Sequence, residues 1–160
     1  MDLTLDFAIA AIAVGPFIAA LAAPSLQRVC GAACGWLLAL VPALIFVFLC
    51  TFIEPIAAGR TISANLDWAP VRGIPLSFLI DGLGLTFALT VSGIGTLILI
   101  YSSAYLNHNP HQGRYFAFML MFMGAMLGLV LADSMIALYA FWELTTFTSF
   151  LLIGFDHTRQ

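Results

Sequence analysis

Charged side chains are scarce in this sequence of 160 residues, and lysine is absent altogether. Charged residues make up 8% of the chain and hydrophobic residues 62%, whereas a soluble domain carries about 25% charged residues. So few charges cannot keep a folded chain of this size in water, which excludes soluble globular and disordered proteins. The net charge of −3 provides no basic patch, so no nucleic-acid partner is expected.

Cysteine is also rare, and the three cysteines lie inside apolar runs. An odd number without a loop cysteine argues against a disulfide framework. Cys30 and Cys34 share one helical face without a neighbouring histidine or carboxylate, so packing is favoured over metal or redox chemistry. Phosphate-loop, Gly-x-Ser-x-Gly and Cys-x-x-Cys motifs are missing too. We therefore predict no cofactor and no metal site.

Long apolar runs are what the sequence has in abundance. Five of them are long enough to cross a hydrocarbon core of about 30 Å as helices, at about 1.5 Å per residue. A chain in lipid must satisfy its own backbone hydrogen bonds, and these runs lack two-residue alternation, so each is predicted to be a helix. The sequence therefore predicts an all-α integral membrane protein with about five transmembrane helices, over about 7–24, 29–53, 80–104, 115–132 and 134–155.

The connections between these helices divide the chain into segments. An external loop with a weak strand pattern over 61–68 separates the two N-terminal helices from the last three. A short connection over 24–28 begins at a proline that is predicted to end the first helix, and Pro42 is predicted to kink the second. The predicted segments are 1–53 (two helices), 54–79 (external loop), 80–155 (three helices) and 156–160 (a cytoplasmic, truncated end).

Five helices place the two ends of the chain on opposite sides of the membrane. The acidic residues at positions 2 and 6 argue that the first apolar run is a retained span and not a signal peptide, which would open with positive charge. The side that holds the C-terminus carries Arg28, Arg114 and Arg159, and only Asp156 as an acid. The positive-inside rule therefore predicts an outside N-terminus and an inside C-terminus.

Glu143 is the one acidic residue near the middle of a predicted helix. Placing Asp, Lys or Arg at that depth costs about 2.5–3.5 kcal/mol, so a glutamate there needs a partner, a wet cavity or a proton. Tyr139 and Thr146 fall on the same helical face, where their hydroxyls could bond the carboxyl or hold water. Two interpretations stay open: a proton path, and a neutral glutamate that joins two helices.

Two aspartates lie at predicted helix ends. Asp81 begins the third helix at the membrane edge, where it would cap the helix N-terminus or form a cation entry site. Asp133 is placed to cap the fifth helix. His108 and His111 share a polar loop without a carboxylate cluster, which favours solvated side chains over a metal site.

Small and flexible residues recur at helical spacing. Gly31 with Gly35, and Gly124 with Gly128, have the spacing of close helix packing. A methionine stripe along the fourth predicted helix favours adaptable packing over a metal path. The stripe consists of Met119, Met123 and Met126.

Residues 78–155 resemble a known family of membrane proteins. The resemblance rests on Phe-Leu-Ile-Asp-Gly-Leu at 78–83, Met-Gly-Ala-Met-Leu-Gly at 123–128 and, most specifically, Leu-Tyr-Ala-Phe-Trp-Glu-Leu-Thr at 138–145. Together these motifs resemble the antiporter-like membrane subunits shared by respiratory complex I (chain 5, L-like) and multisubunit Mrp-type cation/proton antiporters. The motifs are most similar to the N-terminal part of the A-type Mrp protein, which is the first subunit of those antiporters.

The resemblance implies a role for Glu143, which matches the family's proton-path glutamate. The family pairs that glutamate with a lysine on a later helix, whereas this sequence has no lysine and no later transport repeats. The resemblance therefore implies the N-terminal part of a longer subunit. It could be a truncated product, a split subunit completed by another chain, or a fragment.

The predicted function is a component of a membrane Na⁺/H⁺ antiporter complex in the bacterial plasma membrane. Glu143, with Tyr139 and Thr146, would contribute to the proton path, and Asp81 to cation entry. The implied partners are other membrane subunits, Na⁺ or H⁺, and the lipid bilayer. The open alternatives are a structural or assembly component, and a truncated complex I-like fragment without transport of its own. Any oxidoreductase chemistry would lie in other subunits, so the chain itself is not predicted to be an enzyme.

Overall fold

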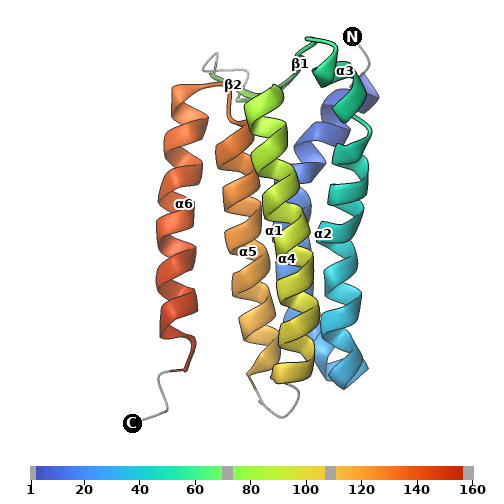
Figure 1. Ribbon diagram of the computed structural model, residues 1–160. Helices are drawn as coiled ribbons and strands as arrows, with labels where there is room; N and C mark the ends of the chain where they lie inside the picture. Colours follow the sequence, from blue (N-terminus) through green and yellow to red (C-terminus); the bar gives the residue numbers. More distant parts are fainter. Residues whose placement is uncertain (1–2, 70–73, 107–110, 157–160) are drawn as a thin grey trace.

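The structure, a computed structural model, describes residues 3–69, 74–106 and 111–156. Its apolar helices stand side by side in one bundle, with α6 at an edge beside α5 (Figure 1). Four helices are long and apolar enough to cross a membrane, and α2 is a shorter apolar helix. The predicted multi-pass membrane fold is therefore confirmed. The bundle helices are α1 (Leu3–Cys30), α2 (Cys34–Cys50), α4 (Gly82–Tyr105), α5 (Gln112–Leu131) and α6 (Met135–Ile153).

The first helix is longer than predicted. The expected connection over 24–28 is wrong, because α1 continues through Pro24 to Cys30. The chain turns instead through a 3-10 segment at Gly31–Ala33, where Gly31 has a positive φ of 53°. Glycine adopts this left-handed conformation without the steric cost of a Cβ, whereas the proline removes one backbone donor and the rest of the helix compensates.

The external segment is more ordered than a loop. It contains the short helix α3 (Ile53–Ala57) and an antiparallel hairpin of β1 (Ile62–Ala69) and β2 (Ile74–Ile80). The register pairs Ile62 with Ile80. The weak strand pattern over 61–68 is thus confirmed. The sequence pattern did not predict β2, because its apolar end runs directly into the third predicted helix.

The hairpin is tied to the junction between α5 and α6. Phe78 forms a backbone bridge with Ala132, and the backbone N–H of Asp133 donates to the Ser77 carbonyl at 3.0 Å. The Phe78 side chain is fully buried. The hairpin therefore covers one end of the bundle and holds the tight turn that starts α6 (Figure 1).

Glycines allow three of the close helix contacts. A Cβ at Gly124 would lie 2.8 Å from the Phe17 ring of α1, and a Cβ at Gly35 would lie 2.5 Å from Ser103 Cβ of α4. A Cβ at Gly128 would overlap the Phe141 ring of α6. The packing interpretation is confirmed for these three positions. It is wrong for the fourth glycine of the predicted pairs, at position 31, which faces open space and serves the turn.

Candidate functional site

Helix α6 has little cover from the rest of the chain. Only 17% of its apolar window is buried, against 44% for α5. Thr145 and Thr148 form part of its buried side, whereas Tyr139, Trp142 and Glu143 are exposed. The exposed side of α6 is therefore a large face that the described residues leave uncovered.

Glu143 lies near the middle of this open face. It is close to midway between Met135 and Ile153, the two ends of α6. Its carboxylate has no hydrogen-bond or ion-pair partner among the residues that the structure describes. A glutamate at mid-membrane depth is costly in lipid without a partner, water or a proton. The open face therefore needs further cover in the membrane.

The three residues predicted for the proton path lie on α6, and all three are exposed. The hydrogen bonds expected from Tyr139 and Thr146 to the Glu143 carboxylate are not formed within the described residues. Thr146 Oγ1 donates instead to the Trp142 carbonyl at 3.3 Å. Threonine hydroxyls in helices commonly bond the carbonyl one turn back, which leaves the Thr146 oxygen able to accept a hydrogen bond.

Asp81 caps α4. Its Oδ1 accepts a hydrogen bond of 2.6 Å from the Gly84 backbone N–H, so the predicted cap is present. The side chain also lines a hollow of about 230 Å³ with Phe87 and Val130. No group of three or more His, Cys, Asp or Glu occurs in the described part of the chain. Cation entry at Asp81 therefore stays a prediction.

Replacing Asp81 by alanine is expected to destabilise the protein by about 1 kcal/mol, because the first turn of α4 loses its side-chain acceptor. Asp81→Asn keeps an acceptor oxygen and should retain most of that stability. The measurement is thermal unfolding of the detergent-solubilised protein. Equal midpoints for Asp81→Ala and wild type would contradict the capping role. Transport that falls in Asp81→Asn at unchanged stability would indicate a charge-dependent function as well.

The cap of α6 is one residue later than predicted. Ser134, not Asp133, accepts the Ala137 backbone N–H through its side chain, at 3.1 Å. The backbone N–H of Asp133 is engaged by the hairpin, which sets the chain direction before the helix starts. A serine oxygen satisfies an N-terminal N–H as well as an aspartate oxygen does.

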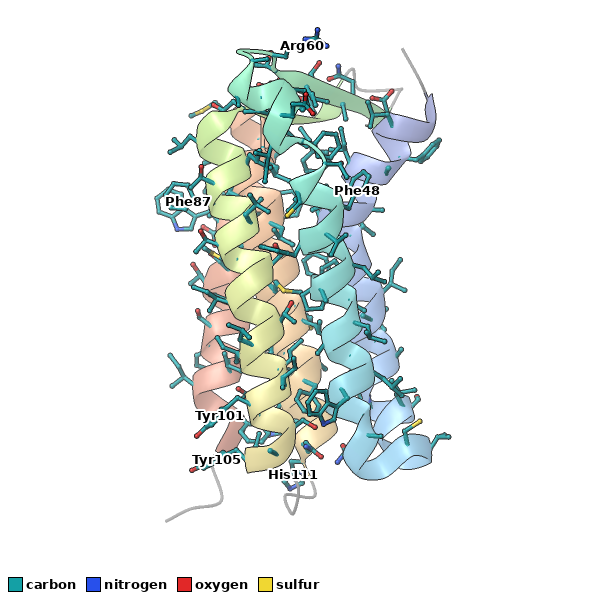
Figure 2. The ribbon with its side chains drawn as sticks, turned by 45° about the vertical axis from the view of Figure 1, so that its right-hand side comes forward. Phe48, Arg60, Phe87, Tyr101, Tyr105 and His111 are labelled. Atoms are coloured by element: carbon teal, nitrogen blue, oxygen red, sulfur yellow. The ribbon has the colours of Figure 1, made fainter. Side chains whose placement is uncertain are left out.

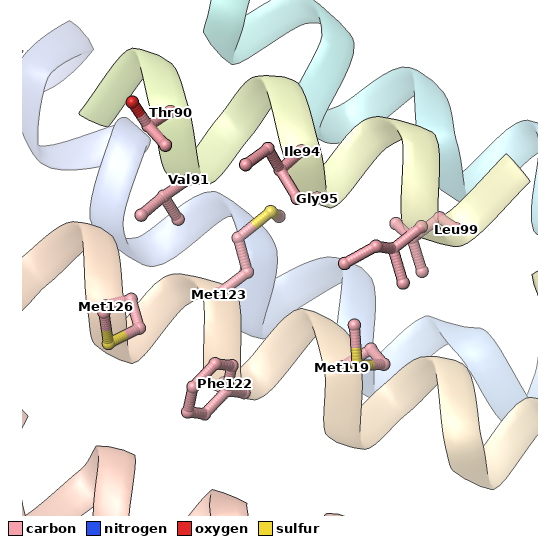
Figure 3. Close-up of a pocket in the computed structure, with 10 residues that line it drawn as sticks. Thr90, Val91, Ile94, Gly95, Leu99, Met119, Phe122, Met123 and Met126 are labelled. Atoms are coloured by element: carbon pink, nitrogen blue, oxygen red, sulfur yellow. The ribbon is translucent and has the colours of Figure 1, made fainter. Parts of the chain in front are cut away.

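The methionine stripe lines a slot of about 220 Å³ between α4 and α5 (Figure 3). Met123 points across the slot towards Gly95, where a Cβ would lie 2.8 Å from its sulfur. The remaining lining is apolar except for the hydroxyl of Thr90. A thioether stripe in such surroundings fits flexible packing. The sequence could show the stripe but not the slot, which depends on the spacing of two helices.

The cysteine and histidine positions add no metal set within the described residues. Cys34 is buried, and its thiol lies 3.8 Å from the Ala23 carbonyl as a weak donor. His111 is the N-cap residue of α5 but makes no capping hydrogen bond with its side chain. His108, the other half of the predicted pair, lies outside the described residues.

Comparisons with known proteins agree with this arrangement. Residues 68–116 match the family model for the N-terminus of NADH-ubiquinone oxidoreductase (complex I) chain 5. Over 126 residues the chain is 48% identical to the A1 subunit of the Na⁺/H⁺ antiporter of Staphylococcus aureus (strain bovine RF122 / ET3-1), covering 79% of this chain and 16% of that protein. The chain is a relative of the antiporter-like membrane subunits.

Two solved structures share the fold of this antiporter-like chain. A chain in the Mrp complex from Dietzia sp. DQ12-45-1b is 34% identical, with a TM-score of 0.82 over 93% of this chain and 16% of that one. The membrane-bound sulfane sulfur reductase, an archaeal respiratory membrane complex, is 20% identical with a TM-score of 0.73, over 89% and 22%. The second match shows the fold alone.

The antiporter-like chain spans 16% of the length of the curated A1 protein. Its coverage of the Mrp chain is the same fraction. Most of each relative therefore has no counterpart in these 160 residues, and the open face of α6 lies on a segment that the relatives extend.

Proposed function

We propose that the chain is a component of an Mrp-type Na⁺/H⁺ antiporter complex and that Glu143 serves the proton path of the assembled transporter. The observation that carries this proposal is a carboxylate at the middle of α6, exposed and without a partner in the described residues. It occurs in a chain that is 48% identical to a protein named as the A1 subunit of an Na⁺/H⁺ antiporter. A mid-membrane ionisable residue is a functional site by default.

The surroundings of Glu143 support a site that is completed by other helices. The sequence contains no lysine, and the described arginines 28, 60 and 114 lie at or beyond helix ends and not within α6. A cationic partner for Glu143 at mid-membrane depth therefore comes from outside this set of helices. Other membrane subunits of the complex are the proposed source, and the bacterial plasma membrane is the proposed location.

A second candidate function is assembly without transport. The open face of α6 also presents large apolar side chains, Trp142, Phe147 and Phe150, which are 59%, 54% and 72% exposed. Such a face suits docking against another membrane helix. In that case Glu143 would join two helices as a neutral hydrogen-bonding group and would carry no proton between the two sides.

The membership proposal is tested by purifying the tagged chain from its native membrane in mild detergent, with mass spectrometry of every co-purifying polypeptide. Recovery with the other subunits of an Mrp-type complex supports the proposal. Recovery in an assembly without such subunits overturns it. The proton-path role is tested in the same assembled complex by Glu143→Gln, which is expected to lose Na⁺-coupled proton transport while the amount of complex stays unchanged.

A further inference from the structure

The end of the bundle opposite the hairpin contains a polar hollow of about 340 Å³. The last turns of α1 meet the first turn of α5 here, and Gln27 Oε1 accepts the backbone N–H of Gly113. A Cβ at Gly113 would lie 3.2 Å from the Pro24 Cα, so only glycine allows this approach. The contact fixes the two helix ends that form the hollow, which is lined by Pro24, Gln27, Arg28, His111 and Arg114.

Positive charge dominates this hollow. Arg28 is exposed and has no ion-pair or hydrogen-bond partner among the described residues. Arg114 donates one hydrogen bond from Nη2 to the Phe155 carbonyl at 3.0 Å, and its buried Nε has no acceptor in the same set of residues. The sequence places a single acid, Asp156, at this end. The other described acids, Asp6, Glu54, Asp67, Asp81 and Asp133, lie at or near the hairpin end.

Two tyrosines mark the depth of the hollow in the membrane. Tyr101 and Tyr105 occupy the last turns of α4, are exposed, and stack with ring centroids 5.9 Å apart. They lie at the same end of the bundle as His111 (Figure 2). Tyrosine is enriched at the headgroup level of membranes, where one part of the ring is apolar and the hydroxyl is hydrated. The hollow is therefore at the level of lipid phosphates.

We propose that this hollow binds the phosphate of an anionic phospholipid headgroup, with Arg28 and Arg114 as its charge partners. Guanidinium groups suit phosphate oxygens in charge and in geometry. The polar lining fits a headgroup and not an acyl chain, and the interfacial depth favours a lipid over a free phosphate. The site is independent of the proton path, because it lies at the opposite end of α5 from the start of α6 and uses no residue of the open face.

The test measures phospholipid retained by the native complex after detergent washing, using native mass spectrometry with added phosphatidylglycerol or phosphatidylcholine. Arg28→Gln is expected to reduce retained phosphatidylglycerol about fivefold, the scale of one arginine at an anionic surface. Arg28→Lys keeps the charge and should retain the lipid. Arg60→Gln is the matched control, because Arg60 is an exposed arginine at the other end of the bundle.

Three outcomes would overturn the proposal. The first is equal retention of phosphatidylglycerol by wild type and Arg28→Gln. The second is equal retention of phosphatidylcholine and phosphatidylglycerol, which would indicate binding without selection for net charge. The third is displacement of phosphatidylglycerol by millimolar inorganic phosphate with equal effect on stability, which would indicate a free-anion site in place of a lipid site.

Discussion

Replacing Glu143 by glutamine is expected to reduce coupled Na⁺/H⁺ transport by about 10²-fold or more, the scale seen when a positioned proton-transfer group is lost. Glutamine keeps the length and hydrogen-bonding capacity of the side chain but cannot take up or release a proton. The side chain is exposed on the open face of α6, so the substitution should not disturb the packing of this chain. Transport is measured in inverted membrane vesicles and divided by the amount of assembled complex.

Glu54→Gln is the matched control for this substitution. Glu54 is also an exposed glutamate, but it lies in the short helix α3 at the end of the bundle. Its replacement should leave transport unchanged. Unchanged transport per complex in Glu143→Gln would rule out the proton-path role. If Glu143→Ala lowers the amount of complex while transport per complex stays constant, the glutamate serves assembly.

Replacing Gly124 by valine is expected to destabilise the bundle by about 1–3 kcal/mol or more, the scale of overpacking in a filled core. A Cβ alone at this position would lie 2.8 Å from the Phe17 ring and 3.1 Å from the Ala13 carbonyl oxygen. The carbonyl belongs to the backbone of α1 and cannot rotate away. The substitution would therefore push α1 and α5 apart along the interface where they pack, and it should lower the midpoint of thermal unfolding in detergent.

Gly15→Val is the matched control for the packing effect. Gly15 lies in α1, and a Cβ there would have no heavy atom within 4 Å. The same substitution should therefore change stability by much less than at Gly124. Equal loss at both positions would show that the intrinsic cost of valine in the helix, and not the close approach of α1 to α5, governs the result.

The helices and the open face of α6 could be predicted from sequence because they depend on local properties. Length and apolar content identify a membrane helix, and the helical repeat places Tyr139, Glu143 and Thr146 on one face. The small-residue spacing likewise predicted close contacts at Gly124 and Gly128. Each of these signals depends on which residues occur within a few turns and not on distant parts of the chain.

The features that sequence reasoning missed depend on contacts between distant segments. Pro24 is usually a helix breaker, but α1 packs against α5 along this region and continues to the glycine turn. Ser134 caps α6 in place of Asp133, because the hairpin binds the Asp133 backbone. The polar hollow combines Arg28 and His111, which are 83 positions apart (111 minus 28), and only the folded arrangement of α1 and α5 brings them together.

Helix α6 is fastened near both ends and open in the middle. At its start the hairpin holds the Asp133 backbone through the Ser77 carbonyl, and just after its end Arg114 of α5 holds the Phe155 carbonyl. A beam that is pinned at both ends cannot swing outward as a rigid body, and its easiest movement is bending at mid-span. Glu143 lies at that mid-span, so a change of its protonation would act on the most compliant point of the helix while both attachments stay in place.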